Sequence, residues 1–275
     1  MEKINIMING LPGKVAENIA YHISKDDRFT LIPASLTGPD IKDKFFKSKN
    51  LAIELLTPDT RDEKIASIQK QYKNIIAIDY THPTAVNKNA KFYIKNNIPF
   101  VMGTTGGDRK KLISDVMNSS ISAIIAPNMA KQIVGFQAMM EYAAKTFPDL
   151  FKGYNMEINE SHQAHKADTS GTAKAMVGYF NNLGVDFSVD QIKKERNPEN
   201  QKSKWGIPEE HIGGHAWHTY TLVSPDKTTK FSFTHNINGR DIYANGTIDA
   251  VIYLHKKLQG LSKGEVFTMI DVLKG

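Results

Sequence analysis

The stretch Ile4-Asn-Ile-Met-Ile-Asn-Gly-Leu-Pro-Gly-Lys-Val-Ala16 decides the fold class of this chain. Its first six residues form an apolar run typical of a buried strand, and apolar side chains then recur every four positions, which predicts a helix over Lys14–Ser24. Gly10 and Gly13 lie in the turn between them. Such a turn can bring backbone N–H groups close to a pyrophosphate at the helix start. Two glycines of the full dinucleotide motif are missing, so a plain strand-to-helix turn remains the alternative.

The first half of the chain continues the alternation of strands and helices. Helical patterns follow at Arg61–Tyr72 and after Pro83, which is a residue favoured at the first helical position. Further strands are predicted at Phe29–Leu36, Leu51–Leu56, Ile75–Asp79, Pro99–Met102 and Ser122–Ala126. This alternation predicts right-handed βαβ units and a mainly parallel sheet.

The pattern changes near Pro127. A long helix is predicted at Lys131–Thr146 and another at Ser170–Leu183, whereas the strands now alternate apolar and polar residues, as strands with one covered face do. These strands are Tyr154–Ser161, Ala216–Ser224 and Lys230–Asn236. A loop is predicted at Asn197–Lys204, and a last helix, predicted at Gly246–Leu258, returns to the first domain. The second half therefore predicts a smaller α+β domain with a mixed or antiparallel sheet.

Composition excludes several classes of protein. The chain of 275 residues contains no cysteine, which rules out disulfides, thiolate metal sites and thiol catalysis, including that of phosphorylating aldehyde dehydrogenases. No apolar run is long enough for a membrane span, and the start of the chain has no pattern of a signal or transit peptide, so a cytoplasmic protein is expected. The net charge of +6 favours anionic ligands; nucleic acid is not expected, because the lysines are scattered and no stripe of base-stacking aromatic residues lies between them.

Small polar residues follow three of the predicted strands, where open α/β sheets bind ligands. The second strand ends in Pro33-Ala-Ser35-Leu-Thr-Gly38 without a carboxylate that would bond a ribose, so a 2′-phosphate is tolerated, with Lys42 and Lys44 nearby. Asp79-Tyr-Thr-His and Gly103-Thr104-Thr105-Gly-Gly follow two later strands. Ordinary loops are the alternative at each place.

The densest group of reactive side chains lies between Glu157 and Ala173. Ser170-Gly171-Thr172 precedes a helix, where hydroxyls and free N–H groups can hold a carboxylate. His162, His165 and Lys166 lie just upstream; a histidine can deliver a proton at neutral pH and a lysine can hold an anion. A charged loop with a routine helix cap is the alternative. No metal site is expected, because the segment lacks a recognisable ligand spacing.

At this segment the chain resembles a known family. Glu160-Ser-His162-Gln-Ala-His-Lys166-Ala-Asp-Thr-Ser170-Gly-Thr172 is similar to the signature of dihydrodipicolinate reductases. The resemblance covers the whole chain, through Gly10-x-x-Gly13-Lys14, Gly103-Thr-Thr105-Gly, Ala126-Pro-Asn128, Gly239-Arg240 and Tyr243-Ala-Asn-Gly246-Thr. Gln163 stands where the common bacterial pattern has a second histidine, and Asp168-Thr-Ser is one residue shorter than the bacterial form. Both departures, with Met129-Ala-Lys-Gln132 and Pro208-Glu-Glu-His-Ile-Gly213, resemble the plant-type branch.

The resemblance implies an oxidoreductase of lysine biosynthesis by the diaminopimelate route. NAD(P)H would pass a hydride to a cyclic dicarboxylate, 4-hydroxy-tetrahydrodipicolinate or dihydrodipicolinate, to give tetrahydrodipicolinate. It implies an α/β fold, with a Rossmann-like dinucleotide-binding domain over 1–127 that 241–275 rejoins, and a substrate-binding and oligomerisation domain over 128–240. NADPH is the expected cofactor, with NADH also used, and the expected assembly is a homodimer or homotetramer.

The resemblance also implies the roles of individual residues. The catalytic residues would be His162, which supplies the proton, and Lys166, which holds a substrate carboxylate together with Gly171 and Thr172; no metal is implied. The substrate would be bound by Gln163, Ser170, Gly171 and Thr172. The cofactor would be bound by Gly10, Leu11, Pro12, Gly13, Lys14, Val15, Ser35, Asp79, Gly103, Thr104, Thr105, Ala126, Pro127, Asn128 and Met129.

Two rival functions fit the same nucleotide fold. A non-catalytic dinucleotide sensor has no use for the segment that contains His162 and Lys166. Another two-domain reductase of an amino-acid precursor, such as a homoserine-type dehydrogenase, typically relies on a Lys/Asp pair instead of this segment. Both rivals are therefore discriminated by residues 157–173.

Overall fold

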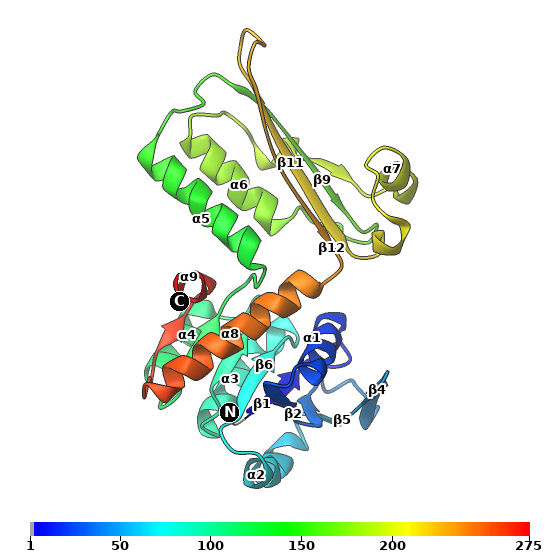
Figure 1. Ribbon diagram of the computed structural model, residues 1–275, viewed down its shortest axis with the longest axis vertical. Helices are drawn as coiled ribbons and strands as arrows, with labels where there is room; N and C mark the ends of the chain where they lie inside the picture. The colour runs from blue at the N-terminus through cyan, green and yellow to red at the C-terminus, as the bar shows by residue number, and fades with distance from the viewer. Residues whose placement is uncertain (1–2) are drawn as a thin grey trace. The chain divides into compact units, whose positions relative to one another are not determined.

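The computed structural model describes residues 3–275 (Figure 1). It divides into two compact units: the chain up to Val134 together with Asp241–Gly275, and Gly135–Arg240. We call them the first unit and the second unit. Within the described residues, no helix has the length and apolar character needed to cross a membrane.

A six-stranded parallel sheet forms the centre of the first unit. Its strand order is β13-β8-β7-β6-β1-β2, and every neighbouring pair is parallel. The strands are β1 (Ile4–Asn9), β2 (Phe29–Leu31), β6 (Ile76–Asp79), β7 (Phe100–Met102), β8 (Ala123–Ile125) and β13 (Val266–Phe267). The chain therefore has the parallel, Rossmann-like sheet that the sequence predicts.

Helices cover both faces of this sheet, because successive side chains of a buried strand point to opposite faces. On one face, Ile6 and Ile8 pack in a core with α1 (Lys14–Lys25) and α8 (Asp241–Gln259). On the other face, Met7 lies in a core with three helices: α2 (Arg61–Gln71), α3 (Val86–Lys95) and α4 (Arg109–Met117). A short helix, α9 (Met269–Lys274), ends the chain and joins the first core through Met269.

The predicted strand Phe29–Leu36 is wrong, because it is two strands in different sheets. β2 ends at Leu31, and β3 (Ala34–Leu36) pairs in parallel with β5 (Leu51–Leu56). β4 (Phe45–Ser48) completes this separate three-stranded sheet. Pro33 lies between β2 and β3 and has no N–H to continue a ladder. The predicted strand over Leu51–Leu56 exists, but outside the main sheet.

The second unit contains a four-stranded mixed sheet of order β10-β9-β11-β12. β9 (Asn155–His162) is antiparallel to β11 (His215–Val223) and parallel to β10 (Lys193–Glu195), and β11 is antiparallel to β12 (Lys230–Asn238). Two helices, α5 (Lys131–Thr146) and α6 (Gly171–Asn182), pack on one face of the sheet around a core that includes Ile158 and Phe180 (Figure 1). The predicted mixed-sheet α+β domain is confirmed.

Residues 197–204 form no loop, contrary to the sequence prediction. They contain the helix α7 (Pro198–Ser203). The side chain of Asn197 accepts a hydrogen bond from the backbone N–H of Glu199, and Pro198 occupies the first turn. Cap and proline together start a helix even in a strongly polar stretch. The last long helix also begins earlier than predicted, at Asp241 rather than Gly246.

Candidate active site

The turn after β1 has the features of a pyrophosphate site. Gly10 has φ +111°, and a Cβ atom there would lie 2.2 Å from the carbonyl oxygen of Tyr80, so only glycine fits. Gly13 is exposed and precedes the first residue of α1, and no side chain caps this helix. The first N–H groups of an uncapped helix are free to bind an anion. The residues present therefore fit the diphosphate of a dinucleotide.

A second glycine loop packs on the same tyrosine. A Cβ atom at Gly103 would lie 2.3 Å from Cζ of Tyr80. The Tyr80 hydroxyl lies 2.7 Å from the hydroxyl of Thr247 on α8. Tyr80 therefore holds the loops after β1 and β7 at fixed places beside it.

Ser35 is fully buried and supports the turn after β1. Its hydroxyl accepts a hydrogen bond of 3.4 Å from the N–H of Leu11, and Thr37 donates one of 2.7 Å to the Leu11 carbonyl. Lys42 and Lys44 are exposed beyond this strand end. The first loop is thus fixed to the end of β3, where no carboxylate stands to reject a 2′-phosphate.

Asp79 is also fully buried, at the end of β6. Its Oδ1 accepts hydrogen bonds from the backbone and hydroxyl of Thr81 and from the hydroxyl of Thr104, at 2.6–3.1 Å. Its Oδ2 accepts one of 3.0 Å from Asn89 and one of 2.7 Å from Tyr93. We call these five residues the Asp79 network. It fixes the loops after β6 and β7 from within.

The remaining predicted cofactor residues surround the same edge of the sheet, because β1, β6, β7 and β8 all end there. Asn128 accepts a hydrogen bond of 2.9 Å from the N–H of Ala130, which shapes the loop after β8. The buried members of this set are Leu11, Thr104, Ala126 and Met129, and the half-buried members are Gly10, Val15, Gly103 and Asn128. The exposed members are Pro12, Gly13, Lys14, Thr105 and Pro127. The exposed members are the ones a cofactor can reach directly.

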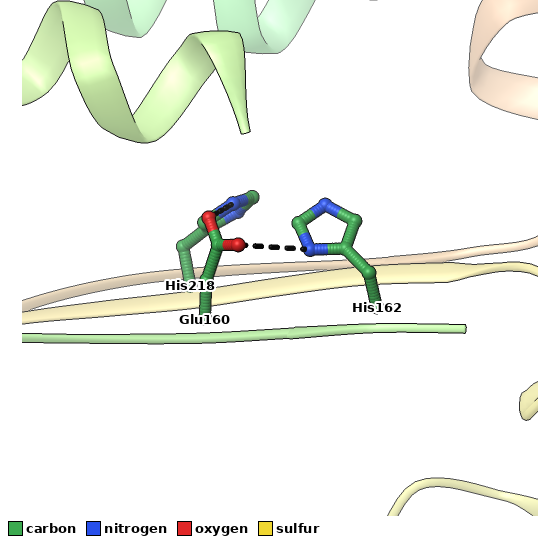
Figure 2. A group of neighbouring side chains, drawn as sticks. All are labelled: Glu160, His162 and His218. Carbon is green, nitrogen blue, oxygen red and sulfur yellow. Dashed lines mark ion pairs between the residues drawn. The ribbon is translucent and has the colours of Figure 1, made fainter. Parts of the chain in front are cut away.

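In the second unit, strand register brings distant polar residues together. Glu160 and His162 lie two residues apart on β9, so their side chains share a face. His218 on β11 lies directly opposite Glu160, and His235 on β12 lies directly opposite His218. Figure 2 shows the carboxylate of Glu160 beside both imidazoles. We call Glu160, His162 and His218 the Glu160 cluster.

Glu160 is completely buried and negatively charged. One carboxylate oxygen, Oε1, accepts a hydrogen bond from Arg196 and lies 3.8 Å from His162 Nδ1. The other, Oε2, accepts a hydrogen bond of 3.1 Å from the N–H of Ser170 and lies 3.8 Å from His218 Nε2. Burial alone would raise the pKa of Glu160, but the contacts with His218, Arg196 and Ser170 outweigh it and lower this pKa to about 2.

His162 is neutral at neutral pH in the free protein. Burial, and then the neighbouring side chains of His218, Arg196 and Lys166, lower the pKa of its imidazole to about 3, although Glu160 acts in the opposite direction. The backbone carbonyl of His162 accepts a hydrogen bond of 2.7 Å from Gln201 on α7, which fixes the end of β9. Further negative charge placed beside this imidazole would raise its pKa.

The predicted substrate residues follow directly. Gln163 is half-buried next to His162, and the Lys166 ammonium pairs with Asp168 at 2.7 Å. Ser170 precedes α6 without capping it by its side chain, and a Cβ atom at Gly171 would meet no atom within 4 Å, so the helix start is open. Glu160 links His162 to this helix start, since it bonds the N–H of Ser170.

The sequence did not predict three residues near this site, which are Arg196, His218 and His235. Arg196 donates hydrogen bonds to the backbone carbonyl of Lys166 at 2.8 Å and to that of Asp168 at 3.4 Å, so it fixes the loop before α6. One signal was present for His218, which falls on the buried face of a predicted strand with Tyr220. Nothing in the sequence signals the approach of Arg196 to Glu160.

Comparisons with known proteins agree with this geometry. Residues 4–129 match the family model "Dihydrodipicolinate reductase, N-terminus" and residues 133–273 match "Dihydrodipicolinate reductase, C-terminus". The chain is 44% identical over 271 residues to 4-hydroxy-tetrahydrodipicolinate reductase 2, chloroplastic, of Arabidopsis thaliana, covering 98% of this chain and 77% of the relative. It is 44% identical over 269 residues to the probable 4-hydroxy-tetrahydrodipicolinate reductase 1, chloroplastic, of Oryza sativa, covering 98% of this chain and 78% of the relative.

A solved structure has the same fold. The dipicolinate-bound dihydrodipicolinate reductase from Paenisporosarcina sp. TG-14 aligns with a TM-score of 0.65 at 18% identity and covers 97% of this chain and 98% of that one. The resemblance seen in the sequence, and its likeness to the plant-type branch, is therefore confirmed by the family models and by the plant relatives. The chain belongs to the dihydrodipicolinate reductase family.

Proposed function

We propose that this chain reduces 4-hydroxy-tetrahydrodipicolinate, or the dihydrodipicolinate formed from it by loss of water, to tetrahydrodipicolinate with NADPH, in the diaminopimelate route to lysine. One observation carries the proposal beyond family membership. In the second unit, Glu160 joins a buried imidazole, His162, to an uncapped helix start at Ser170. A proton donor next to an anion cradle is what the reduction of a cyclic dicarboxylate requires. A dinucleotide sensor requires neither.

His162 acts as the proton donor in this proposal. Its pKa of about 3 in the free protein means that it carries no proton to give at neutral pH. A bound dicarboxylate adds negative charge nearby, which favours the imidazolium and raises this pKa. Glu160, already ionised, supports the same shift. Substrate binding would thus favour protonation of His162, so that the imidazole carries its proton when the substrate is bound.

The substrate carboxylate would lie at the start of α6. The N–H groups of Gly171 and Thr172, the hydroxyls of Ser170 and Thr172, and the Lys166 ammonium supply hydrogen bonds and positive charge there. Lys166 is restrained by Asp168, and Arg196 fixes the loop that connects them. Gln163 would replace the contact that a second histidine makes in the bacterial pattern.

NADPH would be bound by the first unit. A bound nicotinamide dinucleotide supplies the hydride. Gly10 and Gly13 leave room for its diphosphate at the start of α1, and the end of β3 offers Thr37 with the exposed Lys42 and Lys44 rather than a carboxylate. We therefore propose that NADPH is used at least as well as NADH, and that the functional domains divide at 127/128 and 240/241.

The proposed assembly is a homodimer or homotetramer formed through the second unit. Large apolar side chains are exposed there: Met139 at 64% and Tyr142 at 66%, one turn apart on α5, followed by Phe147 and Leu150. Exposed apolar side chains that gather in one region mark interaction surfaces. Light scattering on the purified protein gives the mass of the assembly. The cytoplasm is the proposed compartment, although both plant relatives are named as chloroplastic, and imaging of a tagged full-length protein tests it.

The decisive assay is oxidation of NADPH by the purified protein with freshly generated product of dihydrodipicolinate synthase. We expect turnover that depends on this product and a kcat/KM for NADPH at least equal to that for NADH. Binding of NADPH without oxidation would favour the sensor. Turnover with an aspartate-derived aldehyde instead would favour the other reductase class.

A further inference from the structure

Three histidines of the second unit, the buried His162 and His218 and the half-buried His235, have buried ring nitrogens without a hydrogen-bond partner. These atoms are Nδ1 of His162, both ring nitrogens of His218, and Nδ1 of His235. The rings form a row, with centroids 5.0 Å apart between His162 and His218 and 4.6 Å apart between His218 and His235. Buried polar atoms are rarely left unpaired in folded proteins, and a group of them calls for an unseen partner.

Two of these histidines face the same carboxylate (Figure 2). His162 Nδ1 and His218 Nε2 each lie 3.8 Å from an oxygen of Glu160, and the three potential ligand atoms lie within 4.8 Å of one another. The three side chains are 8%, 2% and 0% exposed, in that order. They stand on adjacent strands, β9 and β11, in fixed register, so the arrangement is held by backbone pairing rather than by a loop.

We propose that Glu160, His162 and His218 form a binding site for a zinc ion, and that zinc inhibits the enzyme reversibly. Two imidazoles and one carboxylate are a ligand set that zinc uses where its fourth position stays open. Ligand atoms around a tetrahedral zinc lie about 3.4 Å apart, given bonds of about 2.1 Å. The separations in the cluster, 3.8 Å for each histidine–carboxylate pair and at most 4.8 Å overall, are longer than this value and must shorten by side-chain rotation when the ion binds.

The neighbours of Glu160 set how firmly the ion is held. Arg196 bonds Oε1 and the N–H of Ser170 bonds Oε2, but each carboxylate oxygen has two lone pairs and keeps one for a metal. The positive charges of Arg196 and Lys166 oppose a divalent cation in the same place. The site therefore suits an ion that binds and leaves, rather than one that belongs permanently to the fold.

Inhibition, unlike binding, rests on the proposed function of His162. Zinc would occupy Nδ1 of His162 and place two positive charges next to that imidazole. Both effects oppose protonation, which the reduction needs at this residue. Zinc bound here would therefore lower the rate without touching the dinucleotide loops of the first unit.

The test uses the full-length protein, freed of metal by a chelator and then titrated with ZnCl2. Wild type is compared with His218→Ala and with His165→Ala, which removes an exposed histidine three residues from His162. Calorimetry without substrate should show one zinc per chain for wild type and for His165→Ala. Loss of a supporting outer contact alone weakens metal binding about 10–100-fold, so loss of the ligand at 218 should weaken it by about 100-fold or more. The zinc concentration for half inhibition, relative to each variant's own zinc-free rate, should rise in parallel.

Equal zinc affinity in His218→Ala and wild type would overturn the site, as would the absence of binding to wild type. Binding without inhibition would overturn the inhibitory role. Should His218→Ala fail to fold, His218→Asn and the rise of wild-type Tm with ZnCl2, set against MgCl2, serve in its place. Metal-free protein that binds zinc but never oxidises NADPH would refute the proposed function and leave the site standing.

Discussion

The Asp79 network and the Glu160 cluster are both built on a fully buried carboxylate, yet they differ in how completely their polar atoms are paired. Asp79 accepts five hydrogen bonds, and none of the unpaired buried atoms in the described chain belongs to its network. Glu160 is bonded on each oxygen, but the two imidazoles beside it have unpaired ring nitrogens. The first group is complete without a ligand, and the second is completed only by a proton, an ion or a substrate.

This difference separates support from chemistry. A carboxylate that is fully bonded inside the protein holds loops in place and offers nothing to a ligand. Unpaired imidazoles beside a carboxylate keep a free energy cost in the folded protein, which bound substrate can relieve. We therefore expect changes in the Asp79 network to act on stability and changes in the Glu160 cluster to act on turnover.

The largest expected effect is on catalysis in the Glu160 cluster. His162→Ala removes the proposed proton donor and should lower kcat by about 10²–10⁴, the usual range for general acid catalysis. The urea midpoint of unfolding should fall only by what the lost packing of the buried ring costs, because Nδ1 had no hydrogen bond to lose. Steady-state kinetics measure kcat, with His165→Ala as the matched control. Near-normal turnover in His162→Ala would refute the assignment of His162 as the proton donor.

The next effect is on stability in the Asp79 network. Asp79→Asn turns an acceptor into a donor that faces the donors Asn89 and Tyr93, and should lower the free energy of unfolding by about 3–5 kcal/mol. His218→Phe, by contrast, removes ring nitrogens without a hydrogen-bond partner and a 3.8 Å contact with Glu160, and should lower it less, by about 1 kcal/mol. Urea unfolding of both variants measures these two changes. Equal losses in the free energy of unfolding would contradict the distinction between the two regions.

A smaller effect separates the carboxylate cradle from the dinucleotide loops. Lys166→Ala and Thr172→Ala should each raise the KM for the dicarboxylate about tenfold or more, because a charge-assisted hydrogen bond is worth roughly 1.5–3 kcal/mol. The Kd for NADPH should stay unchanged, since the glycine loops that would hold it belong to the first unit. Fluorescence titration with NADPH and kinetics with substrate measure the two constants separately. If both constants worsen alike, these residues support the fold instead.

The smallest effect is on the pH dependence of stability. The pKa of His162 is lowered from 6.5 to about 3 and that of His235 from 6.5 to about 4, both chiefly by burial. The unfolded chain takes up these protons near pH 6.5 and the folded protein does not, so stability falls as the pH drops from about 6.5 toward 4. Each histidine contributes a slope of at most about 1.4 kcal/mol per pH unit. His235→Phe should flatten this slope in urea unfolding at pH 7, 6 and 5; an unaltered slope would argue against a neutral imidazole at position 235 in the folded protein.

The sequence predicts the two sheets because periodicity is a local property, and it fails where a boundary depends on distant pairing. Phe29–Leu36 is a mainly apolar run in which only Thr30 and Ser35 are polar, so nothing local shows that Ala34–Leu36 joins β5 rather than β1. Val266–Phe267 is too short for its period to be read, yet it extends the main sheet. Asn197-Pro198 begins a helix, but the polar residues around it led to the prediction of a loop.

The candidate site shows the same limit. Residues 160–172 are contiguous, so the sequence alone groups His162, Lys166 and Ser170. His218 joins them only through the register of β9 and β11, and Arg196 only through the path of the chain after β10. The prediction that no metal ligand spacing exists considered one segment, whereas the Glu160 cluster takes its third member from another strand.

The packing of Tyr80 against two glycine loops constrains the order in which this protein can change its sequence. At Gly103 an added methyl group would meet the tyrosine ring, so a smaller residue at position 80 could first make room for it. At Gly10 the methyl group would meet the backbone of residue 80, which every amino acid shares, so no prior substitution at that position opens a path. Gly103 can therefore be replaced in evolution by two successive substitutions, first at position 80 and then at position 103. Gly10 cannot be replaced by this route, whatever side chain stands at position 80.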